Sequence, residues 1–314
     1  MATNKNLFFR LTKGLVNKDQ VFLKSLETET FSYQQMISMS GQYANALIET
    51  GAKKNDRVIV KSGKNIECIW LYLACLRVGA VYVAINPSYT PAETTFFVND
   101  SEPYLYISEE TSIEQELKNL LRAKKIITLT LKGSDKYSLD NIASNCASNF
   151  ETCFSDSKDI AAILYTSGTT GRSKGAILTH ENLFTNAKSL SSIWHFSSKD
   201  TLLHILPIYH THGLFVAFNT AILSKAAILF MHTFDSAQVI SNFQNATVLM
   251  GVPTHYFRLL KQKGLNKKSA SQIRLFISGS APLPAEVHKN FFKRTISFIV
   301  SYIINSIGIH TIYV

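Results

Sequence analysis

The feature that most constrains this chain is a loop rich in glycine and hydroxyl residues, Thr166-Ser-Gly-Thr-Thr-Gly-Arg-Ser-Lys-Gly175, which follows a short apolar run at 160–165. The apolar run is typical of a buried strand. Glycines let the backbone approach a ligand closely, and successive backbone N–H groups in such a turn form a concave anion site. Hydroxyl donors and the charge of Lys174 add to that site. The pattern therefore predicts a polyphosphate ligand.

The loop does not fit the Walker pattern, because Gly171 is followed by Arg-Ser-Lys-Gly. A surface loop that is merely rich in turn residues is the alternative interpretation. The complete string Tyr-Thr-Ser-Gly-Thr-Thr-Gly-x-x-Lys-Gly resembles the phosphate loop of the adenylate-forming superfamily, which includes acyl-CoA synthetases. The resemblance implies an ATP site that includes Thr166, Ser167, Gly168, Thr169, Thr170, Gly171 and Lys174. It also implies that Thr166 lies beside the Mg²⁺ that accompanies ATP.

Composition indicates a globular protein, since 46% of the 314 residues are hydrophobic. The net charge of +10 suits an anionic ligand such as a nucleotide. We expect no nucleic-acid partner, because neither a binding motif nor a dense basic run is present. Four cysteines without C-x-x-C spacing argue against a zinc site, and reduced thiols fit a cytoplasmic protein. The N-terminus lacks the apolar core of a signal peptide.

Strand and helix patterns alternate along the chain, which favours an α/β fold with parallel sheets and covering helices. We expect strands near 56–61, 80–85, 104–108, 125–131, 160–165, 202–207, 226–231, 247–252 and 274–278. We expect helices near 65–78, 91–100, 114–123, 181–193, 214–223, 254–263 and 284–292. By resemblance, residues 1–295 form part of the large N-terminal domain of an adenylate-forming enzyme, with layered sheets.

Two histidines lie one residue apart in Leu206-Pro-Ile-Tyr-His-Thr-His-Gly213. Zinc binding would need a third ligand at suitable spacing, and none is evident. Burial of a histidine that caps a strand end is another interpretation. Within the superfamily, Leu-Pro-x-x-His-x-x-Gly follows the phosphate loop and lies beside the acyl site. By that resemblance, His210 is the catalytic and substrate-binding histidine.

Arg258 lies in Met250-Gly-Val-Pro-Thr-His-Tyr-Phe-Arg-Leu-Leu260, within an amphipathic helical pattern. A bare sequence would favour an exposed arginine, although a guanidinium can also bind a carboxylate through two hydrogen bonds. This segment resembles malonyl-CoA synthetases, in which the matching arginine holds the far carboxylate of malonate or methylmalonate. The resemblance implies that Arg258 selects dicarboxylates.

A run of small residues ends the strand at 274–278 and continues into a loop. Small residues let a flat ring lie against the backbone at the carboxyl end of a parallel strand. A simple strand-to-helix turn is compatible with this role. The resemblance makes the run a wall for adenine and the acyl-adenylate, formed by Ser278, Gly279, Ser280, Ala281 and Pro282. Ser278 is also expected to contact the acid.

The resemblance implies ATP-dependent ligation of an acid to coenzyme A, as in fatty acid metabolism. The acid carboxylate attacks the α-phosphate of Mg-ATP, and the thiol of coenzyme A then displaces AMP. Positioning and charge stabilisation would supply most of the catalysis.

The resemblance extends from about Phe22 to Thr295. Beyond it we expect an aberrant apolar tail at 296–314 and no small C-terminal domain of the family. No Asp or Glu follows Glu286, so the family's magnesium glutamate has no counterpart. We therefore expect impaired adenylation. A nucleotide-binding remnant without catalysis is the alternative function, and a tail-anchored membrane protein is a less favoured alternative.

Overall fold

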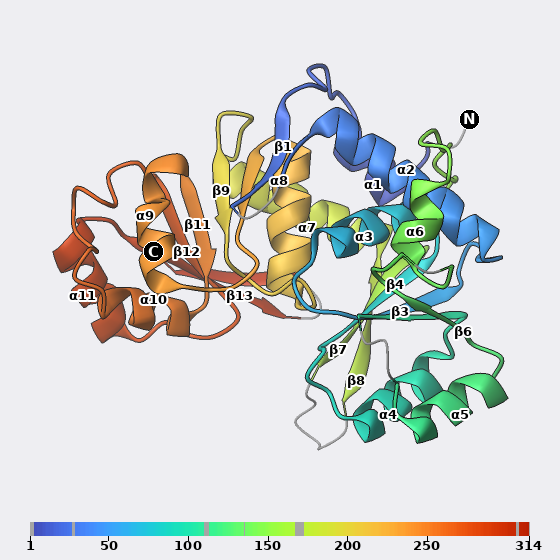
Figure 1. Ribbon diagram of the computed structural model, residues 1–314. Helices are drawn as coiled ribbons and strands as arrows, with labels where there is room; N and C mark the ends of the chain where they lie inside the picture. Colours follow the sequence, from blue (N-terminus) through green and yellow to red (C-terminus); the bar gives the residue numbers. More distant parts are fainter. Residues whose placement is uncertain are drawn as a thin grey trace. The chain divides into compact units, whose positions relative to one another are not determined.

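The computed structural model describes residues 3–26, 29–109, 113–134, 136–166, 173–305 and 308–313; the side chains of Thr166 and of residues after 302 are outside that description. The chain forms two compact units, each with its own sheet (Figure 1). Unit 1 comprises Met1–Gly14, Gln34–Phe184 and Ile208–His210. Unit 2 comprises Leu15–Tyr33, Thr185–Pro207 and Thr211–Val314. The α/β fold class predicted from the sequence is confirmed.

Unit 1 is built on a sheet with the order β6-β5-β3-β4-β7-β8, in which β7 and β8 are antiparallel and the other neighbours are parallel. Its strands are β3 (Arg57–Lys61), β4 (Val81–Ile85), β5 (Leu105–Ser108), β6 (Ile127–Thr130), β7 (Ile160–Thr166) and β8 (Lys174–Thr179). Its helices are α1 (Leu7–Thr12), α2 (Tyr33–Glu49), α3 (Ile66–Val78), α4 (Pro91–Ser101), α5 (Gln115–Ala123) and α6 (Leu139–Ser144). Tyr33, the first residue of α2, belongs to unit 2.

The helices of unit 1 begin and end where local chemistry predicts. A capping box between Thr90 and Glu93 opens α4, with Pro91 in its first turn. Gly79 ends α3 in the left-handed conformation at φ 81°. Phe97 of α4 and Leu117 of α5 pack on one face of the sheet in a shared apolar cluster.

Unit 2 is built on a sheet with the order β14-β13-β12-β11-β9-β10-β1-β2. Its strands are β1 (Val21–Ser25), β2 (Thr30–Ser32), β9 (Thr201–His204), β10 (Ala227–Phe230), β11 (Val248–Gly251), β12 (Leu275–Ser278), β13 (Ile299–Asn305) and β14 (Gly308–Tyr313). Its helices are η1 (His212–Phe218), α8 (Asn219–Ser224), α9 (Ser236–Ser241), η2 (Phe243–Asn245), α10 (Pro253–Leu260) and α11 (Ala285–Thr295). Helix α7 (His180–Ile193) begins in unit 1 and ends in unit 2.

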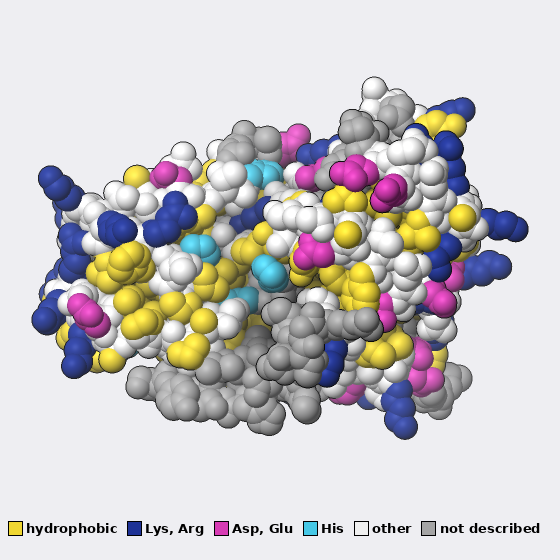
Figure 2. Space-filling view, turned by 90° about the horizontal axis from the view of Figure 1, so that it is seen from below, with side chains coloured by type: hydrophobic (Ala, Val, Ile, Leu, Met, Phe, Trp, Pro, Cys, Tyr) yellow, Lys and Arg dark blue, Asp and Glu magenta, His cyan; other side chains and the backbone are white. Residues whose placement is uncertain are grey.

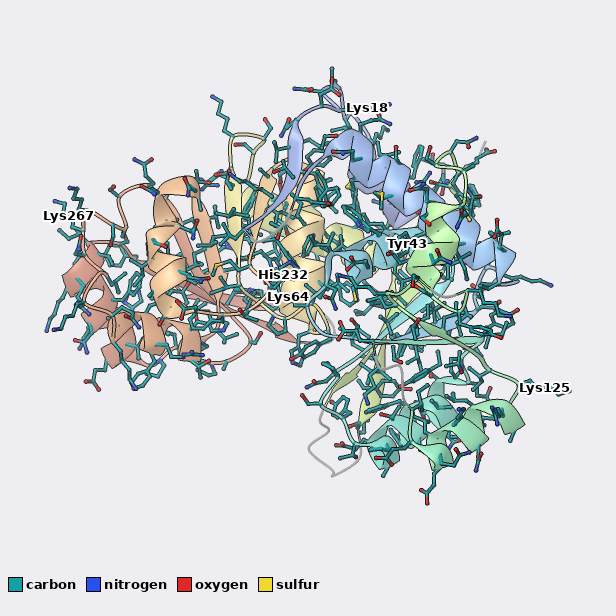
Figure 3. All side chains as sticks on the ribbon, in the orientation of Figure 1. Lys18, Tyr43, Lys64, Lys125, His232 and Lys267 are labelled. Atoms are coloured by element: carbon teal, nitrogen blue, oxygen red, sulfur yellow. The ribbon has the colours of Figure 1, made fainter. Side chains whose placement is uncertain are left out.

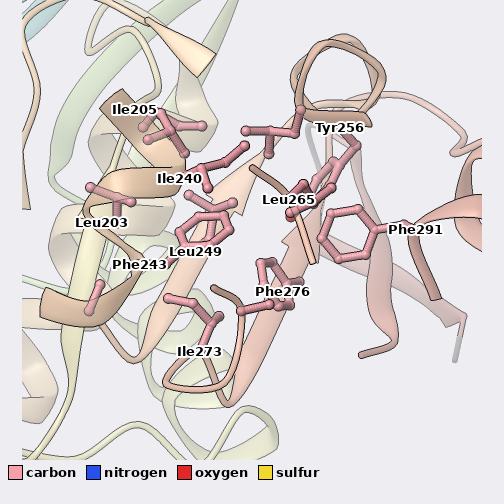
Figure 4. Packing of buried hydrophobic residues seen from close by; sticks show 14 of the residues in the cluster. Leu203, Ile205, Ile240, Phe243, Leu249, Tyr256, Leu265, Ile273, Phe276 and Phe291 are labelled. Carbon is pink, nitrogen blue, oxygen red and sulfur yellow. The ribbon is translucent and has the colours of Figure 1, made fainter. Parts of the chain in front are cut away.

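The core of unit 2 lies between its sheet and helices α9, α10 and α11 (Figure 4). Leu249 and Phe276, on neighbouring strands, meet Tyr256 of α10 and Phe291 of α11 in this cluster. The ring centroids of Phe276 and Phe291 are 4.9 Å apart in an edge-on arrangement. This packing fixes both helices on one face of the sheet.

Some elements differ from the predictions. Strand β8 was missed, because Ala176–Thr179 is too short a run to separate from the helix that begins at His180. Helix α6 was missed, since we expected no helix between 124 and 180. The helix expected at 214–223 consists of two parts, the π-helix η1 and the α-helix α8. In the first turn of η1, the carbonyl of Gly213 accepts a hydrogen bond from His204 Nε2 at 2.8 Å.

The apolar tail forms β13 and β14, so a membrane helix is the wrong interpretation for the described part of 296–314. Its β-branched isoleucines suit a strand, and β13 pairs in parallel with β12. None of the helices among the described residues combines the length and the apolar composition needed to cross a bilayer.

A polar network ties the amino ends of three parallel strands in unit 2. Arg274, just before β12, donates two hydrogen bonds to the carboxylate of Asp200, at 2.7 and 2.8 Å. Thr247, just before β11, donates to the same carboxylate at 2.7 Å. Asp200 itself precedes β9 and is 4% exposed. Burial alone would raise the pKa of Asp200, but the hydrogen bonds from Arg274 and Thr247 outweigh it and lower that pKa.

We predict that Asp200→Asn lowers the free energy of unfolding by about 2–4 kcal/mol at neutral pH, because Arg274 loses its carboxylate partner. Since folding lowers the pKa of Asp200, its carboxylate stabilises the fold above the unfolded pKa of about 4 and less as the pH falls. The difference from wild type should therefore shrink in acid. Urea unfolding at about pH 7 and about pH 3 measures this. Asp19→Asn, at an exposed aspartate, is the control; equal effects of the two variants would contradict the prediction.

Candidate active site

The predicted phosphate loop joins the two strands of a hairpin in unit 1. Tyr165 pairs with Gly175, and Thr166 pairs with Lys174. The hydroxyl of Tyr165 donates to Asp100 at 2.6 Å, and its ring packs 4.4 Å from that of Phe97. Hairpin pairing and this anchor therefore fix the base of the loop.

The residues of the loop itself are only partly described. Thr166 is the last residue of β7, and Lys174 is the exposed first residue of β8. The predicted ligands Ser167, Gly168, Thr169, Thr170 and Gly171 lie outside the described residues. Among the residues that are described, no three His, Cys, Asp or Glu side chains gather as a metal site. The predicted contact of Thr166 with Mg²⁺ stays a prediction.

In unit 2, the carboxyl ends of parallel strands bring together two segments that the sequence singled out. Gly251, at the end of β11, pairs with Ser278, at the end of β12. The amide of Gly279 donates to the carbonyl of Gly251 at 3.0 Å, which extends the pairing by one residue. The run from Ser278 to Pro282 thus begins beside the segment that leads into Arg258. Carboxyl ends of parallel strands are where open α/β sheets bind ligands.

Gly279 is required by close packing. A Cβ atom at this position would lie 2.5 Å from Cε1 of Tyr302 and 2.9 Å from Cε1 of His212. Real Cβ atoms do not approach other atoms so closely, so only glycine fits without a shift of these rings. Ser280 follows with a φ of 69°, and its side chain is exposed, as are Ala281 and Pro282.

His212 lies at the centre of this arrangement. Its side chain is buried, and its Nδ1 is 3.4 Å from Oγ of Ser280. The ring of Tyr302 meets it edge-on, at a centroid distance of 5.1 Å. Burial, with a smaller contribution from nearby His255, lowers the pKa of His212 to about 3. The imidazole is therefore neutral at neutral pH and acts as a hydrogen-bonding group.

Three buried polar atoms in this cluster have no hydrogen-bond partner among the described residues: His212 Nε2, Ser278 Oγ and the hydroxyl of Tyr302. Buried polar atoms normally find a partner, in the protein, in water or in a ligand. The cluster thus has the donors and acceptors to bind a small polar group. The sequence motifs pointed to Ser278 but not to His212 or Tyr302. The glycine after His212 and the small residues at 278–281 were the available signals for His212.

The two histidines of the predicted His-x-His pair belong to different units. His210 lies in unit 1, where its exposed ring is 4.7 Å from that of Tyr209. Partial desolvation lowers its pKa below the ordinary value. His212 begins η1 of unit 2. Within unit 2, the structure brings His212 into the cluster with Ser280.

Arg258 is exposed on α10, and its guanidinium carbon lies 4.5 Å above the ring of Phe234. That ring stacks in turn on His255, at 4.4 Å. Within the described part of the chain, no carboxylate pairs with this guanidinium. Stacking orients the group and leaves its N–H donors for an anion.

Comparison with known proteins identifies the family. The model of a family described as "AMP-binding enzyme" matches residues 13–308. The chain belongs to this family. The match continues past Thr295, and the domain boundary predicted there stays a prediction.

Among curated AMP-binding relatives, a malonate–CoA ligase of Arabidopsis thaliana is 27% identical over 309 residues, which cover 88% of this chain and 48% of the relative. A long-chain-fatty-acid–CoA ligase of Bacillus subtilis is 26% identical, and the match covers 93% of this chain and 58% of the relative. The crystal structure of ATP-bound MatB from Rhodopseudomonas palustris matches with a TM-score of 0.94 and 37% identity, over 99% of this chain and 62% of that one. This chain thus spans about half the length of the curated relatives that it matches.

We predict that Gly279→Ala lowers the free energy of unfolding by about 1–3 kcal/mol, since the new methyl group forces the rings of Tyr302 and His212 to move. Tyr302→Leu should reduce this cost, so the double variant should lose less than the sum of the two single variants. Chemical denaturation of the four proteins measures the coupling. Gly264→Ala is the control, because its Cβ would meet only Ile240, at 3.7 Å. If the losses of unfolding free energy in the two single variants add up in the double variant, contact with the Tyr302 ring does not cause the destabilisation by Gly279→Ala.

Proposed function

We propose that this chain provides the nucleotide- and acid-binding part of an ATP-dependent acid–CoA ligase, with malonate or methylmalonate as the acid. The cluster at the carboxyl ends of β11 and β12 carries this proposal. It combines buried polar atoms that lack a partner among the described residues with the close packing of two rings on Gly279, in a chain of the AMP-binding family. Malonate is the acid in the name of one relative.

The reaction proceeds in two steps. A carboxylate oxygen of the acid attacks the α-phosphorus of ATP, and the bond to the bridging oxygen of pyrophosphate breaks. The sulfur of coenzyme A then attacks the acyl carbon, and AMP leaves with the carboxylate oxygen. Each step breaks one bond at the attacked atom as it forms another, the thiol of coenzyme A releases its proton to solvent, and neither step requires an oxidant. Mg²⁺, where bound, neutralises phosphate charge in the first step.

The residues of unit 2 would form the wall for the acyl-adenylate. Gly279 makes room for the rings of His212 and Tyr302, and the exposed residues Ser280, Ala281 and Pro282 offer the surface on which a flat ring could lie. His212 stays neutral at physiological pH, so it can hydrogen-bond an oxygen of the acid without adding charge. These contacts position the carboxylate and exclude water, rather than transfer a proton.

The phosphate groups would bind at the loop after β7. Hairpin pairing holds both ends of that loop, and Lys174 brings a positive charge to one end. Thr166 ends β7 on the other side, which suits a contact with Mg²⁺ or a phosphate oxygen. His210, exposed in unit 1, is proposed as the second histidine for the acid.

The specificity for a dicarboxylate would come from Arg258. Its guanidinium is exposed, stacked on Phe234, and without a carboxylate partner among the described residues. Such a group can hold the second carboxylate of malonate through two hydrogen bonds. A monocarboxylate such as acetate has no second carboxylate to bind the guanidinium of Arg258.

A second candidate is a nucleotide-binding protein without turnover. The observation that favours it is that Asn305-Ser-Ile-Gly-Ile-His-Thr-Ile312, near the place where the resemblance puts the magnesium glutamate, contains no acidic residue. Malonate-dependent exchange of pyrophosphate into ATP separates the two candidates. Exchange above background supports the ligase, whereas saturable ATP binding without exchange supports the second candidate.

For the acid, we predict that Arg258→Met weakens the binding of a malonyl sulfamoyl-adenosine, a stable analogue of the adenylate, by about 10- to 100-fold. The acetyl analogue, which lacks the second carboxylate, should bind both proteins equally well. Calorimetric titration measures the four affinities. Lys261→Met removes a neighbouring charge and serves as the control. If Arg258→Met weakens both analogues equally, Arg258 does not read the second carboxylate.

A further inference from the structure

The positive charge of this chain is concentrated in one segment of unit 2. Residues 253–297 contain nine Lys and Arg and one acidic residue, Glu286. The net charge of this segment is therefore +8, compared with +10 for the whole chain. Arg258, Arg274 and Arg294 are engaged with Phe234, Asp200 and the carbonyl of Leu260. The other six are lysines, all exposed: Lys261, Lys263, Lys267, Lys268, Lys289 and Lys293.

These lysines share one part of unit 2. Helices α10 and α11 lie side by side, since Arg294 donates to the Leu260 carbonyl at 2.5 Å and the rings of Tyr256 and Phe291 are 5.4 Å apart. The lysines follow α10 or lie on α11, and the side chain of Lys267 points away from the ribbon in Figure 3. In the described part of the chain, none of them pairs with a carboxylate.

Large apolar side chains are exposed among these charges. Phe257, Ile296 and Phe298 are 53%, 55% and 59% exposed. Figure 2 shows apolar side chains edged by Lys and Arg, with little acidic surface, at the end of the view that holds α10 and α11. We call these six lysines and three apolar residues the basic–apolar face.

We propose that the basic–apolar face binds the surface of an anionic lipid bilayer. Lysines near such a surface gain from its negative potential, and adjacent apolar side chains insert at the boundary between headgroups and acyl chains. The charge is complementary, because residues 253–297 contain nine Lys and Arg and one acidic residue, Glu286. The chain would lie on the membrane and not span it.

The apolar members favour lipid over nucleic acid. Single-stranded nucleic acids bind exposed aromatic faces by stacking. Here the ammonium of Lys261 lies 4.5 Å from the ring centre of Phe257, and Phe298 already stacks on Phe292 at 4.5 Å. Ile296 offers an aliphatic surface on which no base stacks. Such side chains fit the interfacial layer of a bilayer.

Vesicle co-sedimentation of the full chain tests the proposal. Vesicles of phosphatidylcholine with phosphatidylserine should bind the protein, whereas pure phosphatidylcholine vesicles should bind it weakly. The triple variant Lys263→Glu, Lys267→Glu and Lys293→Glu should bind anionic vesicles at least about tenfold more weakly. Higher salt should weaken the binding of the wild-type chain, because the lysines are exposed.

Two further variants make the result specific. The matched control Lys53→Glu, Lys118→Glu and Lys124→Glu reverses three exposed lysines of unit 1 and should bind like wild type. The variant Phe257→Ser and Phe298→Ser keeps every charge and should lose several-fold in affinity for the same vesicles. Circular dichroism melting checks that each variant is folded.

Three outcomes would overturn the proposal. In the first, wild type shows no preference for anionic vesicles. In the second, the unit 1 control loses as much binding as the face variant. In the third, the Phe257→Ser and Phe298→Ser variant binds vesicles like wild type while the face binds single-stranded RNA more tightly than lipid. The third result would assign the face to nucleic acid.

Discussion

The parallel pairing of β9, β11 and β12 is the constraint on which the candidate site depends. At the amino ends of these strands, the buried carboxylate of Asp200 binds Arg274 and Thr247, each from the residue before a strand. At the carboxyl ends, the same register brings Gly251 beside Ser278. A slip of one residue would reverse which side chains face the core and would separate the segments that carry the site.

The site also depends on the absence of a side chain at Gly279. The missing side chain of Gly279 makes room for the rings of Tyr302 and His212. These rings bury polar atoms that have no partner among the described residues. Leaving such atoms unpaired costs stability, so a site that binds a polar ligand is a natural explanation for them. The same burial keeps His212 neutral, which suits a group that orients an anion.

Much of the fold could be predicted from the sequence because it rests on local patterns. The helical spacing of apolar residues predicted α3, and Gly79 predicted its end because glycine readily adopts the left-handed conformation found there. Strand β8 could not be predicted so easily, since its pairing with β7 is decided by the hairpin rather than by its own short run. The tie between Asp200 and Arg274 joins residues 74 positions apart, which no local pattern reveals.

The candidate site was predicted in part. The motif around His210 was found, but a motif does not show that the fold assigns His210 and His212 to different units. Tyr302 lies beyond Thr295, where we expected the resemblance to end, and the fold brings it to Gly279. Arg258 was found by resemblance, and its stacking on Phe234 adds a physical reason for its orientation. The sequence holds no dense basic run, yet residues 253–297 carry +8 of the net charge of +10.

The central claim is that the carboxyl ends of β11 and β12 hold an acyl-adenylate. A crystal structure of the chain with a bound malonyl sulfamoyl-adenosine tests this most directly. We expect electron density for the analogue along Gly279 to Pro282, with hydrogen bonds to at least one of His212 Nε2 and Ser278 Oγ. Density for the analogue at another place, with this cluster unchanged, would contradict it.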